Sequence, residues 1–234
     1  MKLSLDIPDL LIGYFCLLFS LCFHEAAHAA MAHWRGDDSA RLMGRMSLNP
    51  LKHIDPVGTV VFPLIMMTTG VRFLFGWAKP VPFNPRNLKD IRHDPALIGL
   101  AGPVSNIILA VVCALVLRVL AYVIAANAGG EVVLIIVRIL FGLVGINLIL
   151  AIFNMIPIPP LDGHHVLAFN LSPDNKARLA QMAPIGMIMV MMLVWQFDIL
   201  SVPMEYATIG VLHLAFWGTP LWDNLPGLLD LVYG

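Results

Sequence analysis

The sequence predicts an all-α protein that crosses a membrane several times, and three observations carry this prediction. Hydrophobic residues make up 59% of the 234 residues and charged residues only 12%, whereas soluble domains are nearer ~25% charged. The mean hydropathy is +0.84. Apolar stretches of membrane-spanning length, about 20 residues, recur along the chain. The net charge of −1 gives no reason to expect a nucleic acid partner.

The predicted membrane helices form a core and a C-terminal addition. Five apolar stretches are candidates: residues 9–34, 95–125, 132–155, 183–197 and 203–217. The first three predict a three-helix catalytic core, and the last two predict one or two extra C-terminal transmembrane helices. We expect one integral membrane domain over residues 1–234, with its core at about 9–170 and the C-terminal helices at about 180–218.

The connection between the first two core helices predicts an insertion. Residues 57–71 are apolar but broken by glycine and proline, and about 15 residues are too few for a full span, so we expect a re-entrant segment. Residues 73–87 contain three prolines, which exclude a helix and allow an extended edge strand or a loop. Trp77 and Lys79 suit a membrane interface.

The distribution of lysine and arginine predicts the topology. Residues 34–54 hold four of these cations, residues 72–94 hold five and residues 157–178 hold two, whereas residues 127–131 hold none. A re-entrant insertion puts all three positive loops on one side, as the positive-inside rule prefers. We therefore predict a multi-pass protein of the cell inner (cytoplasmic) membrane, with its active site toward the cytoplasm.

The first predicted helix carries the pattern H-E-x-x-H at residues 24–28. Residues four apart lie on one helix face, so His24 and His28 can bind one metal ion. Glu25 is then placed to take a proton from a metal-bound water. Two histidines with an open water position indicate catalytic zinc, because structural zinc has four protein ligands.

A third protein ligand is expected after the third core helix, and three residues are candidates. Asp162 follows a proline-rich break, at the depth where the first helix ends. A carboxylate there could instead cap the helix that begins at Gly163. His164 and His165 are equally suitable ligands for zinc, so the residues alone leave the choice open.

Three ordered motifs resemble those of the site-2 protease family of intramembrane zinc metalloproteases (peptidase family M50). They are H-E-x-x-H at 24–28, G-P-x-x-N at 102–106 and N-x-x-P-x-P-x-L-D-G at 154–163. Two flanking stretches, 48–59 and 75–82, further resemble the compact prokaryotic members without a PDZ domain. In G-P-x-x-N, the small residues allow a close helix neighbour, to which Asn106 can hydrogen-bond.

The resemblance implies a site and an activity. His24, His28 and Asp162 would bind one Zn²⁺ per chain, with Glu25 as general base and zinc-bound water as nucleophile. Asn154 would donate to the scissile carbonyl or its oxyanion, or else bond its own helix backbone. The substrate would be a transmembrane protein in the lipid bilayer, cut in or near its membrane segment.

Substrate contacts are expected from two places. An unwound peptide can add as a strand to an extended edge, and Trp77, Ala78 and Lys79 lie in the predicted edge. Asn106 would line the site. His164 and His165 depart from the family pattern after D-G, which leaves room for one of them to orient Asp162.

Two alternative functions remain open from the sequence. A membrane-anchored zinc protease for soluble, misfolded chains usually carries H-E-x-x-H in an aqueous domain, which this sequence lacks. A non-proteolytic membrane zinc-binding protein, either a carrier or a scaffold, would spread its ligands or have no need of Glu25. Intramembrane proteolysis therefore agrees best with the residues.

Overall fold

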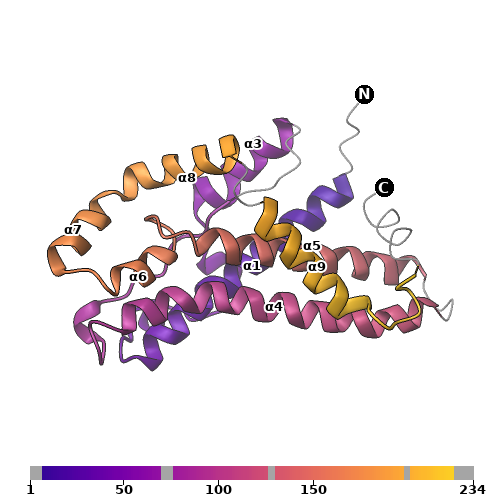
Figure 1. Ribbon diagram of the computed structural model, residues 1–234, viewed down its shortest axis with the longest axis horizontal. Helices are drawn as coiled ribbons and strands as arrows, with labels where there is room; N and C mark the ends of the chain where they lie inside the picture. Colours follow the sequence, from indigo (N-terminus) through magenta and orange to yellow (C-terminus); the bar gives the residue numbers. More distant parts are fainter. Residues whose placement is uncertain (1–6, 70–75, 126–129, 198–200, 224–234) are drawn as a thin grey trace.

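Three long apolar helices form the centre of the protein (Figure 1). The structure is a computed structural model, and it describes residues 7–69, 76–125, 130–197 and 201–223. The three helices are α1 (Ile7–Trp34), α4 (Asp94–Ala125) and α5 (Glu131–Asn154), and each is long and apolar enough to cross a membrane. Their bounds lie within two residues of the three predicted core spans. The predicted all-α membrane fold is confirmed.

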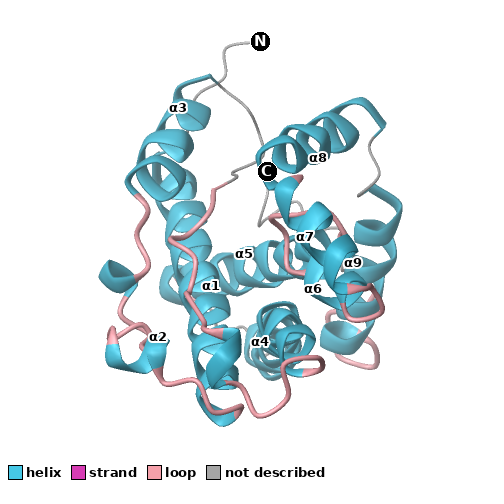
Figure 2. Cartoon of the chain, turned by 90° about the vertical axis from the view of Figure 1, so that its left-hand side faces the viewer, coloured by secondary structure: helices cyan, strands magenta, loops and turns pink. Residues whose placement is uncertain are grey.

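Small side chains on α4 let its neighbours pack closely. Ala110, Ala114 and Ala121 are fully buried, and they share one core cluster with Val137 and Phe141 of α5. Close backbone approach over small residues is a main source of helix association in membranes. Figure 2 looks nearly along α4 and shows α1, α5 and α9 (Ser201–Phe216) around it.

The insertion between α1 and α4 begins with a short helical segment. A π-helix, η2 (Pro56–Val61), continues directly into α3 (Phe62–Thr69). Asp55 caps its start by accepting from the backbone N–H groups of Val57 and Gly58. The two helices extend about 20 Å at 1.5 Å per residue, short of a ~30 Å hydrocarbon core. This length agrees with a re-entrant segment, whose last predicted residues, 70–71, lie outside the described residues.

The predicted edge strand is an extended segment without a partner strand. Residues 76–84 contain no helix, and the described residues contain no β-strand. The backbone N–H groups of Trp77 and Lys79 donate to carbonyls within residues 53–58. Two prolines follow, and they have no N–H with which to continue a ladder. The first residues of the predicted edge, 73–75, lie outside the described residues.

A buried carboxylate ties this segment to the end of α1. Asp37 accepts from the backbone N–H of Asn84 at 2.6 Å, from the side-chain amide of Asn87 at 2.9 Å and from Ser39. Burial raises the pKa of Asp37, but these hydrogen bonds outweigh it and hold the pKa below its usual range. The ionised Asp37 therefore holds the extended segment beside α1.

After α5, the described residues form four helices: α6 (Gly163–Ala168), α7 (Pro173–Gln181), α8 (Ala183–Phe197) and α9. Helix α8 coincides with the predicted fourth span, but its 15 residues make it shorter than a full span. Its Val190 packs against Phe153 and Leu161, near the end of α5. Arg118 of α4 donates to two carbonyls at the end of α9 and so holds that helix against α4.

Candidate metal centre

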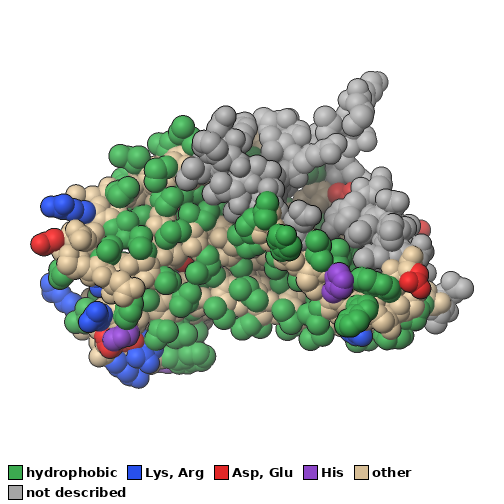
Figure 3. All heavy atoms as spheres, in the orientation of Figure 1, with side chains coloured by type: hydrophobic (Ala, Val, Ile, Leu, Met, Phe, Trp, Pro, Cys, Tyr) green, Lys and Arg blue, Asp and Glu red, His purple; other side chains and the backbone are tan. Residues whose placement is uncertain are grey.

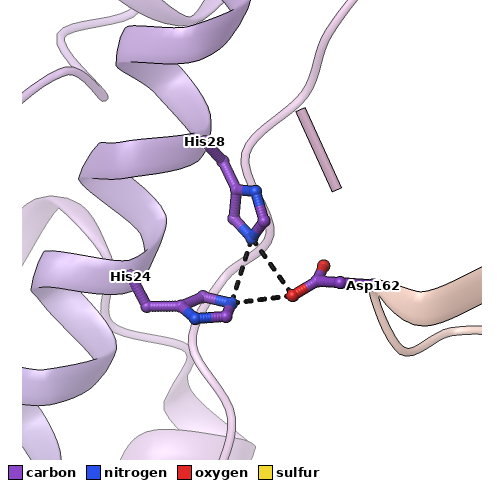
Figure 4. Close-up of side chains that lie close together, drawn as sticks. All are labelled: His24, His28 and Asp162. Atoms are coloured by element: carbon purple, nitrogen blue, oxygen red, sulfur yellow. Dashed lines mark hydrogen bonds and ion pairs between the residues drawn. The ribbon is translucent and has the colours of Figure 1, made fainter. Parts of the chain in front are cut away.

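Two histidines of α1 and a carboxylate that precedes α6 converge on one point (Figure 4). The Nε2 atoms of His24 and His28 lie 3.0 Å apart. Asp162 Oδ2 lies 3.0 Å from His24 Nε2 and 3.3 Å from His28 Nε2. Ligands 2.0–2.2 Å from a tetrahedral zinc ion lie about 3.4 Å from one another. The three atoms are therefore spaced almost as zinc ligands would be.

Asp162 is the one of the three candidates that reaches both histidines of α1. Its side chain makes no capping hydrogen bond to α6, so the alternative capping role is not realised. His164 Nδ1 donates to the Leu161 carbonyl at 2.6 Å, and the His165 ring lies against Phe83. The structure thus favours the ligand implied by the family resemblance.

The charges at this end of the site also suit a cation. Burial raises the pKa of Asp162, but the neighbouring imidazoles of His28 and His24 lower it by more. The net pKa is below its usual range, so the carboxyl is ionised at neutral pH. Burial and the adjacent His164 lower the pKa of His165 to about 4, so this imidazole is neutral there. An ionised carboxylate next to an uncharged imidazole attracts a metal ion, and the imidazole does not repel it.

The hydrogen bonds of the two candidate ligand histidines leave both Nε2 atoms free for a metal. His28 Nδ1 lies 2.7 Å from the Ile98 carbonyl, which can only accept, so Nδ1 carries the proton. His24 Nδ1 donates in the same way to Asn106 Oδ1, at 2.6 Å. When a metal ion takes the place of the Nε2 protons, both Nε2 lone pairs face the point that Asp162 Oδ2 also faces. Three such groups repel one another unless a cation lies between them, and this donor set fits zinc.

Two glycines allow the backbone to approach the centre. A Cβ atom on Gly102 would lie 2.4 Å from both His24 Cε1 and His28 Nε2, so α4 can pass the histidines only at a glycine. A Cβ atom on Gly163 would lie 2.4 Å from the Met155 carbonyl oxygen at the end of α5. These contacts explain, in physical terms, the glycines of G-P-x-x-N and D-G.

Glu25 lines a cavity of about 360 Å³ beside the three candidate ligands. Its Oε2 accepts a hydrogen bond of 2.9 Å from the backbone N–H of Val81, in the extended segment. Val81 lies between two prolines, so its N–H is the one backbone donor of that triplet. The extended segment therefore orients the carboxylate that the sequence predicts to be the general base.

The other predicted site residues occupy different positions around the cavity. Asn154 lines it, while its Nδ2 donates to the Leu150 carbonyl at 3.0 Å, as the alternative backbone role expects. Trp77 and Ala78 also line the cavity, whereas Lys79 is not among its lining residues. Asn106 is fully buried behind His24, away from the cavity, which does not favour the substrate contact we predicted for it.

Sequence reasoning missed three groups near the site: the Val81 N–H, Ser20 and Asn147. The last two are fully buried polar side chains of α1 and α5. A signal for them exists, because uncharged polar residues inside apolar spans are costly unless they find partners. No such signal points to Val81, because its contribution comes from the backbone.

The fold and the site together define a membrane protein with an H-E-x-x-H metal centre, the arrangement of a zinc metallopeptidase. The sequence model described as Peptidase family M50 matches residues 12–195, which include every residue of the centre. The chain therefore belongs to peptidase family M50, the family of the site-2 proteases. It is a multi-pass membrane protein and a zinc-dependent protease by family.

Curated relatives agree with this family. The chain is 37% identical over 182 residues to "Putative zinc metalloprotease YwhC" of Bacillus subtilis (strain 168), covering 76% of this chain and 77% of the relative. It is 28% identical over 229 residues to "Putative zinc metalloprotease Rip2" of Mycolicibacterium smegmatis, covering 88% and 82%. A protein of the same name in Mycobacterium tuberculosis (strain H37Rv) is 28% identical over 215 residues, covering 86% and 78%. No solved structure matches the chain significantly.

Proposed function

We propose that this protein is an intramembrane endopeptidase, which binds one zinc ion and hydrolyses peptide bonds in or near the transmembrane segments of membrane proteins. One observation carries the proposal: two ligands and the general base lie on α1, a helix of membrane-spanning length. All three side chains are less than a tenth exposed. Within the described residues, His24, His28 and Asp162 are the one group able to hold a metal, which does not favour a carrier with ligands along a path.

The proposed chemistry divides between the metal and the chain. Bound zinc would polarise the peptide carbonyl and make water nucleophilic at neutral pH. Glu25 takes the proton of the attacking water and returns it to the leaving amine. The Val81 N–H holds the Glu25 carboxylate in place throughout. Asn154 has a second N–H beyond the one bonded to Leu150, and this N–H can donate to the developing oxyanion.

We propose that the substrate, once unwound, adds as a strand along Trp77 and Ala78. The N–H groups of Trp77 and Lys79 are already bonded to residues 53–58. The peptide groups of Ala78, between them, have no hydrogen-bond partner among the described residues, and Ala78 lines the cavity. An extended peptide can pair with these groups.

Replacing Ala78 with proline tests this edge. Because proline removes the one backbone N–H of this residue, we expect cleavage to fall by up to about tenfold, the loss of one hydrogen bond worth about 0.5–1.5 kcal/mol, with zinc content unchanged. The matched control is Ala78→Ser, which keeps the N–H and should cut at nearly the wild-type rate. Equal rates for the proline and serine variants would rule out strand addition at this residue, and loss of zinc would indicate a folding role.

We propose that the site faces the cytoplasm, across the cytoplasmic membrane. Lysine and arginine side chains gather at the end of the molecule where α6, α7 and the loop after α1 lie (Figure 3). Among the described residues, these cations belong to residues 34–54, 76–94 and 157–178. The positive-inside rule supports a cytoplasmic position for that end.

The experiment uses the purified protein in liposomes with a panel of single-span model substrates. We expect the zinc-loaded protein to cut within or near the membrane segment, with the cut site mapped by mass spectrometry. Removal of zinc with a chelator should abolish cleavage, and added zinc should restore it. Cleavage at an unchanged rate without zinc would overturn the proposal. Cleavage confined to soluble unfolded chains would overturn its intramembrane part.

A further inference from the structure

A row of buried polar side chains leads from the centre of the helix bundle to the metal centre. His24 Nδ1 of α1 donates to Asn106 Oδ1 of α4, and Asn106 Nδ2 donates to Asn147 Oδ1 of α5, both at 2.6 Å. Asn147 Nδ2 then donates to Ser20 Oγ of α1 at 2.8 Å and to the Leu143 carbonyl at 2.7 Å. The row begins and ends on α1 and passes through all three core helices.

These side chains are wholly removed from solvent. Ser20, Asn106 and Asn147 are each 0% exposed, and all three lie within the predicted membrane spans. Amide side chains at such depth are costly unless their donors and acceptors are bonded. The proposed catalytic chemistry uses neither Ser20 nor Asn147. Their presence therefore needs a separate explanation.

The direction of every hydrogen bond in the row follows from one backbone group. The Leu143 carbonyl can only accept, so the Asn147 amide must turn its Nδ2 toward it and its Oδ1 toward Asn106. The Asn106 amide must then present its Nδ2 to Asn147 and its Oδ1 to His24. His24 must place its proton on Nδ1, which leaves Nε2 as the free lone pair.

We propose that Asn147, acting through Asn106, is a positioning residue that fixes the tautomer and ring orientation of His24 and thereby raises the affinity of the centre for zinc. This inference rests on the proposed function, since it assumes that zinc binds here. Partners that hold a ligand histidine by its second nitrogen commonly change metal affinity 10–100-fold. Asn147 is one bond further away, so its effect belongs at the lower end of that range.

The arrangement of His28 makes the proposal specific to His24. His28 Nδ1 donates directly to a backbone carbonyl, that of Ile98, which cannot rotate or be replaced by mutation. His24 instead donates to the side-chain amide of Asn106. The two ends of an amide have nearly the same shape, so a rotation of 180° would exchange its oxygen and its nitrogen. Asn106 Nδ2 also lies 3.5 Å from the Ser20 carbonyl, which is at the limit of a hydrogen bond. The 2.6 Å bond to Asn147 is therefore the stronger constraint that keeps the Asn106 amide from reversing.

The test measures zinc affinity of the full-length protein in detergent, by competition with a chelator, for wild type and Asn147→Leu. We expect Asn147→Leu to bind zinc about tenfold more weakly. The matched control is Ser105→Ala, next to Asn106 on α4, because the Ser105 hydroxyl donates only to the Gly102 carbonyl of its own helix. This control should bind zinc as wild type does.

The thermal unfolding of the zinc-free proteins separates positioning from helix association. A lower Tm with unchanged zinc affinity in Asn147→Leu would show that the row only joins the helices and would overturn the proposal. If leucine prevents folding, Asn147→Ala removes the same amide without adding volume and carries the same test. A wild type that binds no zinc would instead contradict the proposed function, so the two failures are distinguishable.

Discussion

Replacing Glu25 with glutamine is expected to lower the rate of peptide hydrolysis by roughly 10²–10⁴-fold while leaving zinc bound, because a positioned general base contributes about that much. Glutamine has nearly the same shape, and its carbonyl oxygen can still accept the hydrogen bond from Val81 N–H. It has no basic oxygen, however, so it cannot take the proton of the attacking water. The variant isolates the chemical step from the structure around it.

The measurement compares both proteins, with zinc content determined for each, on the same single-span substrate under single-turnover conditions. Equal zinc with a large loss of rate identifies Glu25 as the base. Equal rates in the two proteins would show that the activity is a contaminant or that another group removes the proton. Loss of zinc in Glu25→Gln would mean that Glu25 supports the metal rather than the reaction.

The spans and the histidine pair could be predicted from the sequence because both depend on local rules. A membrane helix needs about 20 apolar residues, and that length can be counted. His24 and His28 share a helix face through their spacing alone. The structure places the three core helices within two residues of the predicted bounds. It also brings the two histidine Nε2 atoms within 3.0 Å.

The third candidate ligand could not be predicted from residue spacing. Asp162 lies far along the chain from His28, and two adjacent histidines have suitable chemistry. Only the family resemblance distinguished Asp162 from these two histidines. The structure supports Asp162 because of how the backbone packs next to it. A Cβ on Gly163 would strike the end of α5, so the backbone turns tightly there. This tertiary contact orients Asp162 toward the two histidines. It cannot be predicted from residue spacing or helix rules.

Asn106 shows most clearly what a sequence motif cannot predict. We predicted that it would hydrogen-bond to a neighbouring helix, which it does, and also that it would contact substrate, which its position does not favour. Both expectations came from one motif, and a motif does not tell which face of its helix meets which neighbour. The Val81 N–H was equally hidden, since any residue except proline supplies the same donor.

Gly102→Ala is the second large effect that we expect, and it should weaken zinc binding by at least a hundredfold. The added Cβ would lie 2.4 Å from His24 Cε1 and from His28 Nε2, and real Cβ atoms essentially never approach below 3.0 Å. Either α4 moves away or both imidazoles rotate, and each movement displaces ligand atoms. Displacing two ligands should exceed the 10–100-fold cost of losing an outer partner.

The control for Gly102→Ala is Gly145→Ala on α5, where no atom lies within 4 Å of the added Cβ. Both changes replace a helical glycine, so both gain the same ~0.5–1 kcal/mol of helix propensity. Only the Gly102 variant should lose zinc in the chelator competition, while the Gly145 variant keeps both zinc and cleavage. Wild-type zinc affinity in Gly102→Ala would show that α4 can retreat from the histidines without cost. The His24–Asn106 bond could not then be a rigid support, because Asn106 lies one turn further along the same helix.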